Sequence, residues 1–147
     1  TRSLANNMRS ASKVYAVDPA MFGAFSPASA LDQGQRLETA VFNALRRRTP
    51  AVRIGSVCRL LIKEKSKSHE VDFVAGDALL MRAYSLIQVS VDMASEKTRE
   101  REIAALDASM AQFDLGESAI VTMDEQADIP CEHGVVHVVP AWKWLLA

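Results

Sequence analysis

The sequence predicts an α/β fold in which α-helices flank a central mixed β-sheet. Its 147 residues are 49% hydrophobic and 24% charged, a composition typical of one ordinary globular domain. Apolar residues recur with a helical period in some segments and alternate with a period of two in others. These two kinds of segment follow one another along the chain, which favours helices packed on a sheet. A chain of this length buries roughly 68 to 70% of its surface on folding, so it needs no metal or disulfide staple.

The first predicted elements are a short strand and two helices. Residues 13–17 form a β-rich run. Asp18 followed by Pro19 is a favourable helix start, with Asp as the N-cap and Pro at the first helical position. A longer amphipathic helix is predicted over residues 32–48, where a proline soon follows.

The middle of the chain predicts a hairpin, a central strand and a long helix. Residues 54–63 are β-branched and aliphatic, residues 64–68 are polar, and residues 69–75 alternate strictly, a pattern typical of a hairpin. Residues 82–91 are apolar enough on both faces to lie centrally in a sheet covered by helices. Residues 95–113 begin with a capping serine and carry apolar side chains at helical spacing.

The last third predicts two more strands and a terminal helix. Gly116 is expected to end the preceding helix. Residues 118–123 and 134–139 read as strands, residues 124–129 as a turn with an acidic rim, and Pro140 as the start of a helical turn. The predicted sheet has four or five strands.

Hydropathy and cysteine usage favour a cytoplasmic protein. No apolar run approaches the ~20 residues of a membrane span, and the first residues lack the apolar stretch of a secretory signal. Cys58 and Cys131 stand 73 positions apart and neither belongs to a CxxC pair. Both are expected to be small core residues in a reducing compartment.

Charge divides between the two halves of the chain. Residues 1–67 carry 12 Lys and Arg against 4 Asp and Glu, whereas residues 68–147 carry 5 against 14. Such asymmetry indicates a surface that faces a polyanion such as DNA. A structural explanation is also open, because three arginines close the 32–48 helix, where cations favour the dipole, and Lys63 and Lys65 are spaced like a solvated strand edge.

Glu38 is expected inside the apolar stripe of the 32–48 helix. On a helical wheel its side chain falls between those of Leu45 and Phe42. An unpaired buried carboxylate is costly, so a cation, a metal ion or a hydrogen-bond donor should lie beside it. The alternative is a position at the rim, paired with an arginine such as Arg59.

Two strands are expected to add polar groups to the same place. With a period of two, Glu70 and Asp72 share one face of their strand, and Gln88 and Ser90 share one face of the next. Aspartate is disfavoured in the middle of a strand. If the two strands are neighbours and the helix of Glu38 covers this face, two acids, an amide and a hydroxyl converge.

A helical Glu, a strand Asp and a following Gln-x-Ser resemble the PD-(D/E)XK pattern of the restriction-endonuclease-like superfamily. In that superfamily the side chains at these positions bind Mg²⁺ and catalyse the cleavage of phosphodiester bonds. The resemblance implies a restriction-endonuclease-like fold with Glu38, Asp72, Gln88 and Ser90 at the catalytic positions. It also implies Mg²⁺ as the cofactor, bound by Glu38, Asp72 and Gln88.

Six ordered segments resemble one branch more closely, the domain of unknown function that ends many bacterial and archaeal AAA-type ATPases. They are LETAVFNALRR, EVDFV, LIQVSVD, KTREREIAAL, IVTMDE and VVPAWKWLL, within residues 12–147. The likeness implies one domain over residues 13–147 behind an ATPase region, with residues 1–12 as a linker or a remnant of that region. The chain holds no Gly-x-x-x-x-Gly-Lys-Ser/Thr run, so ATP is expected only in the other domain.

Ser90 departs from the superfamily pattern, in which a lysine stands at this position. That ammonium would steady the attacking water and the charge on the phosphorane, and loss of one such positioned group typically costs a factor of ~10² to 10³ in rate. Gln88 also removes one negative charge from the metal site. Two substitutes stay open, since Glu70 can supply a carboxylate and Lys63 or Lys65 an ammonium.

These observations favour a catalytically degenerate, nuclease-like accessory domain that binds nucleic acid or a partner protein. An active Mg²⁺-dependent endonuclease and a pure protein-assembly module are the alternatives. The expected partners are its own ATPase domain, DNA and a second copy of the chain.

Two smaller patterns have mainly structural interpretations. Cys131, His133 and His137 are soft metal ligands, but the glycine between them predicts a turn that breaks the set, so zinc is disfavoured. Trp142 and Trp144 cannot share a helical face. One is expected in the core and the other exposed, where it could dock against a partner.

Overall fold

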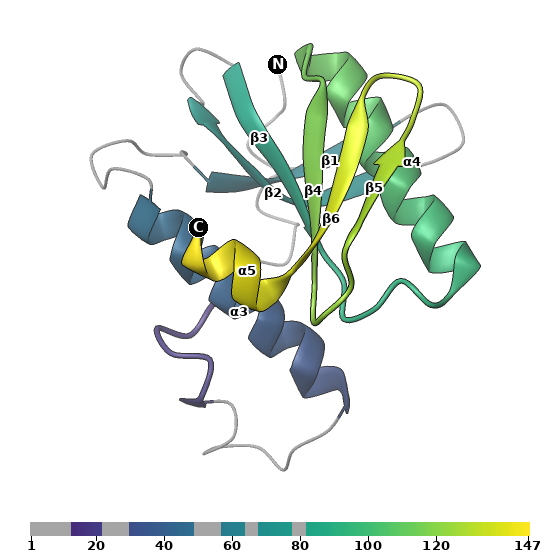
Figure 1. The fold of residues 1–147 in the computed structure, drawn as a ribbon. Helices are drawn as coiled ribbons and strands as arrows, with labels where there is room; N and C mark the ends of the chain where they lie inside the picture. Colours follow the sequence, from purple (N-terminus) through teal and green to yellow (C-terminus); the bar gives the residue numbers. More distant parts are fainter. Residues whose placement is uncertain (1–12, 22–29, 49–56, 64–67, 78–81) are drawn as a thin grey trace.

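The computed structural model describes residues 13–21, 30–48, 57–63, 68–77 and 82–147. These residues form one six-stranded mixed sheet with helices on both faces (Figure 1), which confirms the predicted α/β class. The elements are α3 (Ala30–Arg48), β1 (Val57–Lys63), β2 (Ser68–Asp77), β3 (Arg82–Val89), α4 (Glu96–Phe113), β4 (Glu117–Thr122), β5 (Ala127–Pro130), β6 (Val135–Pro140) and α5 (Ala141–Leu146).

The strand order is β1-β2-β3-β4-β6-β5. The first three strands pair antiparallel as consecutive hairpins, whereas β3, β4 and β6 are parallel and β5 closes the edge antiparallel. Parallel neighbours need a long crossover, which α4 supplies between β3 and β4. The hairpin, the central strand and this helix are all confirmed.

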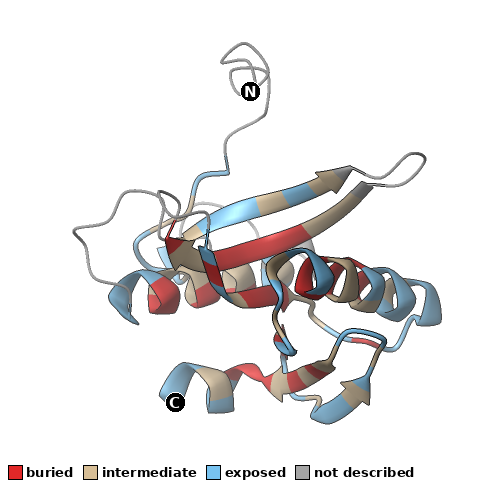
Figure 2. Cartoon of the chain, turned by 90° about the horizontal axis from the view of Figure 1, so that it is seen from above, coloured by how far each residue is buried: buried red, intermediate tan, exposed pale blue. Residues whose placement is uncertain are grey.

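Two cores lie on opposite faces of the sheet. Helix α3 packs Leu37 and Val41 against Phe73 and Ile87 on one face, with α5 beside it. On the other face α4 packs against a second cluster that includes Leu106, Met110, Leu86, Ile120 and Val136. Figure 2 shows the buried residues concentrated in the strands and on the helix sides that face them. The sheet is therefore covered on both sides, as expected of its apolar central strands.

Strand β2 breaks the strict alternation that its sequence predicts. The pairing register shifts here: Leu60 of β1 pairs with Val71, but Cys58, two residues earlier, pairs with Val74, three residues later in β2. Val71 and Val74 consequently both join the core beneath α4. Such a bulge adds one residue to a strand and re-aims the side chains around it. Asp72 lies inside it.

The N-terminal segment is not the predicted strand. Residues 13–17 have no strand partner among the described residues, and a turn follows, in which the Met21 amide donates to the Asp18 carbonyl. The Asp18 carboxylate accepts from the Ala20 amide at 2.8 Å. The segment lies against α3, where Tyr15 stacks on Phe42 with ring centroids 4.1 Å apart. The rest of the helix predicted after Asp18 lies outside the described residues.

Two boundaries in the last third also differ. The predicted turn contains an edge strand, β5, which accounts for the sixth strand; Pro130 is tolerated there because an edge position needs fewer donors. Helix α4 ends at Phe113 as predicted, but its C-cap is Asp114, two residues before the expected Gly116. Asp114 adopts the left-handed conformation with φ 55°, and its amide donates to the Met110 carbonyl. None of the helices in the described ranges is long and apolar enough to cross a membrane.

Candidate functional site

A cavity of about 430 Å³ lies near the end of β3, between the first halves of α3 and α4. Most of its polar lining is ionisable. The acidic, amide and guanidinium side chains that line it are Glu38, Glu70, Asp72, Gln88, Arg101 and Glu102. The structure thus brings Glu38, Asp72, Gln88 and Glu70 to one cavity.

Asp72 and Gln88 are fixed by reciprocal hydrogen bonds between β2 and β3. The backbone pairing of these strands stops at Phe73 and Ile87. Beyond that pair, the Asp72 amide donates to Gln88 Oε1 and the Val89 amide donates to Asp72 Oδ2, both at 3.0 Å. Both side chains are nearly fully buried. They continue the contact between β2 and β3 beyond the last backbone pair.

Lys13 holds the two central carboxylates together. Its ammonium lies 2.7 Å from Glu38 Oε1 and 3.4 Å from Asp72 Oδ1, and 4.0 Å from the carboxylate of Glu70. The Tyr15 hydroxyl donates to the same Glu38 oxygen at 2.7 Å. Glu38 therefore has the cation and the donor that its burial requires.

The segment that carries Lys13 is anchored on α3 and β2. The Tyr15 ring stacks on Phe42 and lies 5.8 Å from Phe73. The side-chain amide of Asn43 donates to the carbonyls of Ala16 and Val17 at 3.0 and 2.9 Å. Sequence reasoning missed Lys13, because no local pattern in residues 13–17 indicates which carboxylates its side chain reaches.

Every acidic side chain that lines the cavity is paired with a cation, and two of these side chains share one. Arg59 pairs with Glu70, so the alternative in which Arg59 pairs with Glu38 is wrong. Arg101 pairs with Glu102, whose side chain is buried. Lys13 serves Glu38 and Asp72 together.

Burial and charge perturb the groups around Lys13. Burial, together with the charge of Glu38, raises the pKa of Asp72 against the opposing effects of the Val89 amide and Lys13. Burial lowers the pKa of Lys13, but its bonds to Glu38 and Asp72 outweigh that effect and leave the pKa raised. Burial and then Glu38 raise the pKa of Tyr15. Lys13 is therefore an ammonium at neutral pH, able to stabilise negative charge and unable to accept a proton.

Ser90 does not line the cavity. Its hydroxyl donates to the Asp92 carbonyl at 2.7 Å, just beyond the end of β3. The expectation that the helix of Glu38 covers the Gln88 face is also wrong, because Ile87 and Val89 pack under α3 while Gln88 alternates with them. Glu38 instead meets Asp72 through Lys13. The side chain of Lys63 and the whole of Lys65 lie outside the described residues.

The arrangement does not fit Mg²⁺ as it stands. Mg²⁺ requires near-octahedral oxygen ligands at about 2.0 to 2.1 Å. Glu38 Oε1, both oxygens of Asp72 and Gln88 Oε1 already accept from Lys13, Tyr15 or backbone amides. A divalent ion between these oxygens would have to displace the Lys13 ammonium.

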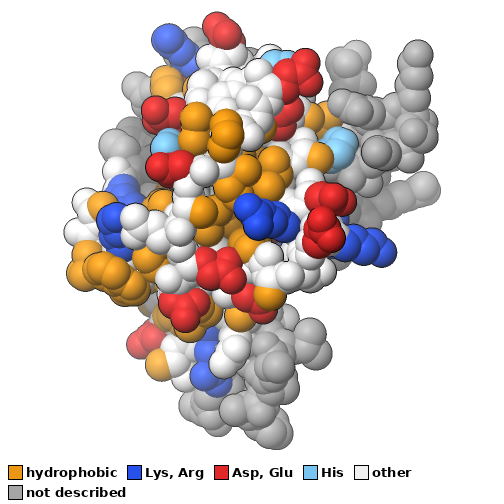
Figure 3. Space-filling model, turned by 45° about the vertical axis from the view of Figure 1, so that its right-hand side comes forward, with side chains coloured by type: hydrophobic (Ala, Val, Ile, Leu, Met, Phe, Trp, Pro, Cys, Tyr) orange, Lys and Arg blue, Asp and Glu red, His pale blue; other side chains and the backbone are white. Residues whose placement is uncertain are grey.

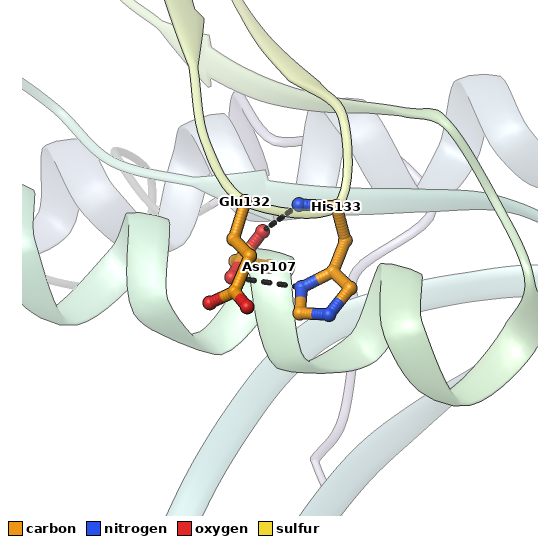
Figure 4. Close-up of side chains that lie close together, drawn as sticks. All are labelled: Asp107, Glu132 and His133. Carbon is orange, nitrogen blue, oxygen red and sulfur yellow. Dashed lines mark hydrogen bonds and ion pairs between the residues drawn. The ribbon is translucent and has the colours of Figure 1, made fainter.

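The predicted Cys-x-His-x₃-His set is divided in the structure. His137 of β6 pairs with Asp128 of β5 at 2.7 Å. His133 instead meets Asp107 of α4 and Glu132 (Figure 4). Figure 3 shows histidines on this side of the molecule next to acidic side chains.

The two tryptophans and the two cysteines differ in exposure. Trp142 is 63% exposed, whereas Trp144 packs against the α3 core, which agrees with the prediction that only one of the two tryptophans is exposed. The Arg48 guanidinium lies 4.3 Å from the centroid of the Trp144 ring. Cys131 is half-buried, but Cys58 is exposed, so its assignment to the core is wrong. Both are free thiols.

Comparisons of this chain with profiles of protein families, with curated proteins and with solved structures find no match.

Proposed function

We propose that this chain is a restriction-endonuclease-like accessory domain of an AAA-type ATPase, and that it binds nucleic acid without cutting it. The observation that carries the non-catalytic part is the contact of the Lys13 ammonium with both Glu38 and Asp72. One fixed positive charge occupies the space between the carboxylates that a divalent ion would need. The acidic side chains that the nuclease-like pattern implies are thus held in ion pairs with the chain's own cations.

The chemistry of the other cavity residues supports this proposal further. Gln88 adds no charge, and its amide oxygen is already bonded to the Asp72 amide. Ser90 lies outside the cavity, bonded to a backbone carbonyl. Neither residue therefore supplies the ligand or the ammonium that phosphodiester hydrolysis would use.

The nucleic-acid part of the proposal is supported by charge. Arg46 and Arg47 are exposed in the last turn of α3, and Arg59 is half-exposed beside the cavity. Cations so placed can contact phosphates without reading sequence. The link to an ATPase is supported by the six segments that resemble such a domain, and a cytoplasmic location by the two free thiols.

A nuclease and binding assay tests the proposal. The chain is incubated with supercoiled plasmid and with single-stranded DNA in Mg²⁺ or Mn²⁺, and binding is measured at several salt concentrations. We expect no cleavage, and an affinity whose logarithm falls linearly with the logarithm of salt concentration. Cleavage that Asp72→Ala abolishes would overturn the non-catalytic part. Absence of binding at low salt would leave a protein partner and overturn the nucleic-acid part.

One observation favours a second candidate, an active endonuclease. The Lys13 ammonium lies 3.4 Å from Asp72 Oδ1 and is the kind of group that Ser90 cannot supply. If that ammonium is catalytic, Lys13→Ala abolishes cleavage, whereas Tyr15→Phe, which keeps the stack on Phe42, preserves it. On the preferred proposal neither protein cuts.

A further inference from the structure

A groove of about 470 Å³ lies on the face of the sheet that α3 and α5 cover, and it shares no lining residue with the acidic cavity. Small side chains from three neighbouring strands line it, namely Ala75, Ser85 and Ala119. Arg48 of α3 and Trp144 of α5 line it as well, and these two helices contact each other (Figure 1). Its volume falls within the range of about 300 to 1,000 Å³ that ligand sites occupy.

A β-bulge turns Tyr84 toward this groove. Ala75 of β2 pairs with Ser85, but Gly76, the next residue, pairs with Ala83, so Tyr84 has no partner on β2. Ala83 packs in the core beneath α4, whereas Tyr84 and Ser85 both line the groove on the opposite face. Strict alternation along β3 would have placed the Tyr84 side chain on the α4 face. The bulge thus re-aims this aromatic side chain, as bulges near functional sites often do.

The bulge depends on a close approach of two backbones. A Cβ on Gly76 would collide with the carbonyl oxygen of Arg82 and with the Cα of Ala83, so only glycine permits this approach. Core packing does not account for Tyr84, because the side chain is 56% exposed and belongs to neither core cluster. The strand irregularity therefore holds a large aromatic ring at an open groove.

Trp144 is held in position by Arg48. The Arg48 guanidinium lies 4.3 Å from the centroid of the Trp144 ring and donates to the Trp144 carbonyl at 2.7 Å. Part of the Trp144 side chain packs against the α3 core, and part of the residue lines the groove. The groove therefore has an aromatic residue from the sheet and another from a helix. Such rings are the surfaces on which proteins stack the bases of single strands.

Cations lie beside the groove. Arg46 and Arg47 are exposed in the last turn of α3, the turn that also reaches the groove. Arg82 is exposed, and its guanidinium lies 6.0 Å from the centroid of the Tyr84 ring. Among the described residues that line the groove, Glu117 is the one acidic side chain. The surroundings of the two aromatic rings are thus mainly positive and complementary to phosphates.

We propose that this groove binds single-stranded nucleic acid, with bases stacked on Tyr84 and Trp144 and phosphates bound by Arg46, Arg47 and Arg82. The inference rests on the nucleic-acid binding proposed above, and it adds the class of nucleic acid and the place of its bases. Only a single strand presents its base faces to side chains, because the bases of a duplex are stacked on one another. Every base has such a face, so binding is independent of sequence.

Tryptophan fluorescence tests where the bases bind. The chain has two tryptophans, so Trp142→Phe leaves Trp144 as the single one. Oligo(dT) should quench the emission of this variant, because a base stacked on an indole quenches it. An abasic oligomer of equal length carries the same phosphates without bases, and it should bind more weakly and quench little. Trp144→Phe, which retains Trp142 outside the groove, should show no quenching.

Matched variants test the contribution of Tyr84 to the affinity. Tyr84→Ala should weaken binding of labelled oligo(dT) by about 5- to 150-fold, the loss typical of one stacked base. Tyr84→Phe keeps the ring and should bind like wild type, and so should Trp142→Ala, which removes an exposed aromatic ring elsewhere. Thermal unfolding checks that each variant is folded. If Tyr84→Ala is not, the comparison with the abasic oligomer and the quenching of Trp144 decide.

The outcomes separate this inference from the proposed function. Equal affinity for oligo(dT) and the abasic oligomer, an unchanged affinity in folded Tyr84→Ala, or binding of duplex DNA alone would overturn the groove as the base-binding site and leave nucleic-acid binding intact. Absence of binding to both oligo(dT) and duplex DNA at low salt would overturn both.

Discussion

At the scale of single residues, Asp72 is an ionisable side chain in a place that disfavours charge. It lies in a bulge of β2, nearly fully buried, with its pKa raised by that burial and by the nearby Glu38. Lys13 offsets one of the two neighbouring negative charges. A residue held in this way typically serves function at some cost in stability.

Asp72→Asn should therefore change the pH dependence of stability. Because the folded state raises the pKa of Asp72 above its ordinary value of 3.8, the folded form binds the proton more tightly, and wild type loses stability as the pH rises from about 3.8 toward neutrality. The asparagine variant lacks this loss, so its stability relative to wild type should be greater at pH 7 than at pH 3. Urea unfolding at both pH values measures the difference, and the exposed Asp124→Asn is the control. A relative stability that falls with pH would contradict the assigned cause.

Gln88 should contribute to stability through a single bond. Its side-chain oxygen is the acceptor for the buried Asp72 amide. Gln88→Leu leaves that amide without a partner and should lower the free energy of unfolding by about 1 to 3 kcal/mol. Ser90→Ala, two residues along and bonded only to a local carbonyl, should cost less than about 0.5 kcal/mol. Urea unfolding measures both losses of stability. Equal losses in the two variants would show that the bond between Gln88 and the Asp72 amide contributes no more to stability than the local bond of Ser90.

At the scale of elements, the long periodic segments could be predicted from sequence and the contacts between them could not. Helices α3 and α4 and the β1–β2 hairpin follow from apolar periodicity and capping. Strand β5 was missed because its residues, ADIP, have low strand propensity and pair only as an edge. The position of Lys13 depends on the path of the chain, since it lies 25 residues from Glu38 and 59 from Asp72. The β2 bulge likewise depends on pairing with β1, which alternation within β2 does not reveal.

Two glycines test how tightly these elements are packed. A Cβ at Gly134 would lie 2.1 Å from the Gly116 carbonyl oxygen, whereas a Cβ at Gly34 would make an ordinary 3.7 Å contact with Val91. Gly134→Ala should destabilise the domain by about 1 to 3 kcal/mol, since backbone must move. Gly34→Ala, inside α3, should stabilise it by up to about 1 kcal/mol. Thermal unfolding of both variants measures these changes in stability. A Gly134→Ala protein as stable as wild type would contradict the close approach of the loop to Gly116.

At the scale of the whole molecule, the basic and acidic halves of the chain meet at the cavity. Lys13 and Arg59 come from the first half, and Glu70 and Asp72 from the second. Part of the charge asymmetry is therefore neutralised inside the domain, which the sequence alone could not indicate. The cations that remain for a polyanion include Arg46 and Arg47 at the end of α3.

Those two arginines should set the salt dependence of DNA binding. Changing Arg46 or Arg47 to Ala should weaken binding to any sequence and reduce the slope of log K against log salt by about 1 for each phosphate that the variant no longer binds. Arg48→Ala is the matched control, because Arg48 is engaged by the carbonyl and ring of Trp144. Fluorescence anisotropy with labelled duplexes measures the slopes. Unchanged slopes in the Arg46 and Arg47 variants would place the nucleic-acid surface elsewhere.

The closure of the acidic site by Lys13 is tested most directly by a calorimetric titration of Mg²⁺ into wild type, Lys13→Ala and Lys13→Ala/Asp72→Asn proteins, with Tyr15→Phe as control. We expect no binding by wild type or Tyr15→Phe, binding by Lys13→Ala once the competing ammonium is gone, and loss of that binding in the double variant. Mg²⁺ binding by wild type that Asp72→Asn removes, or a Lys13→Ala protein that is folded and still does not bind, would contradict this account.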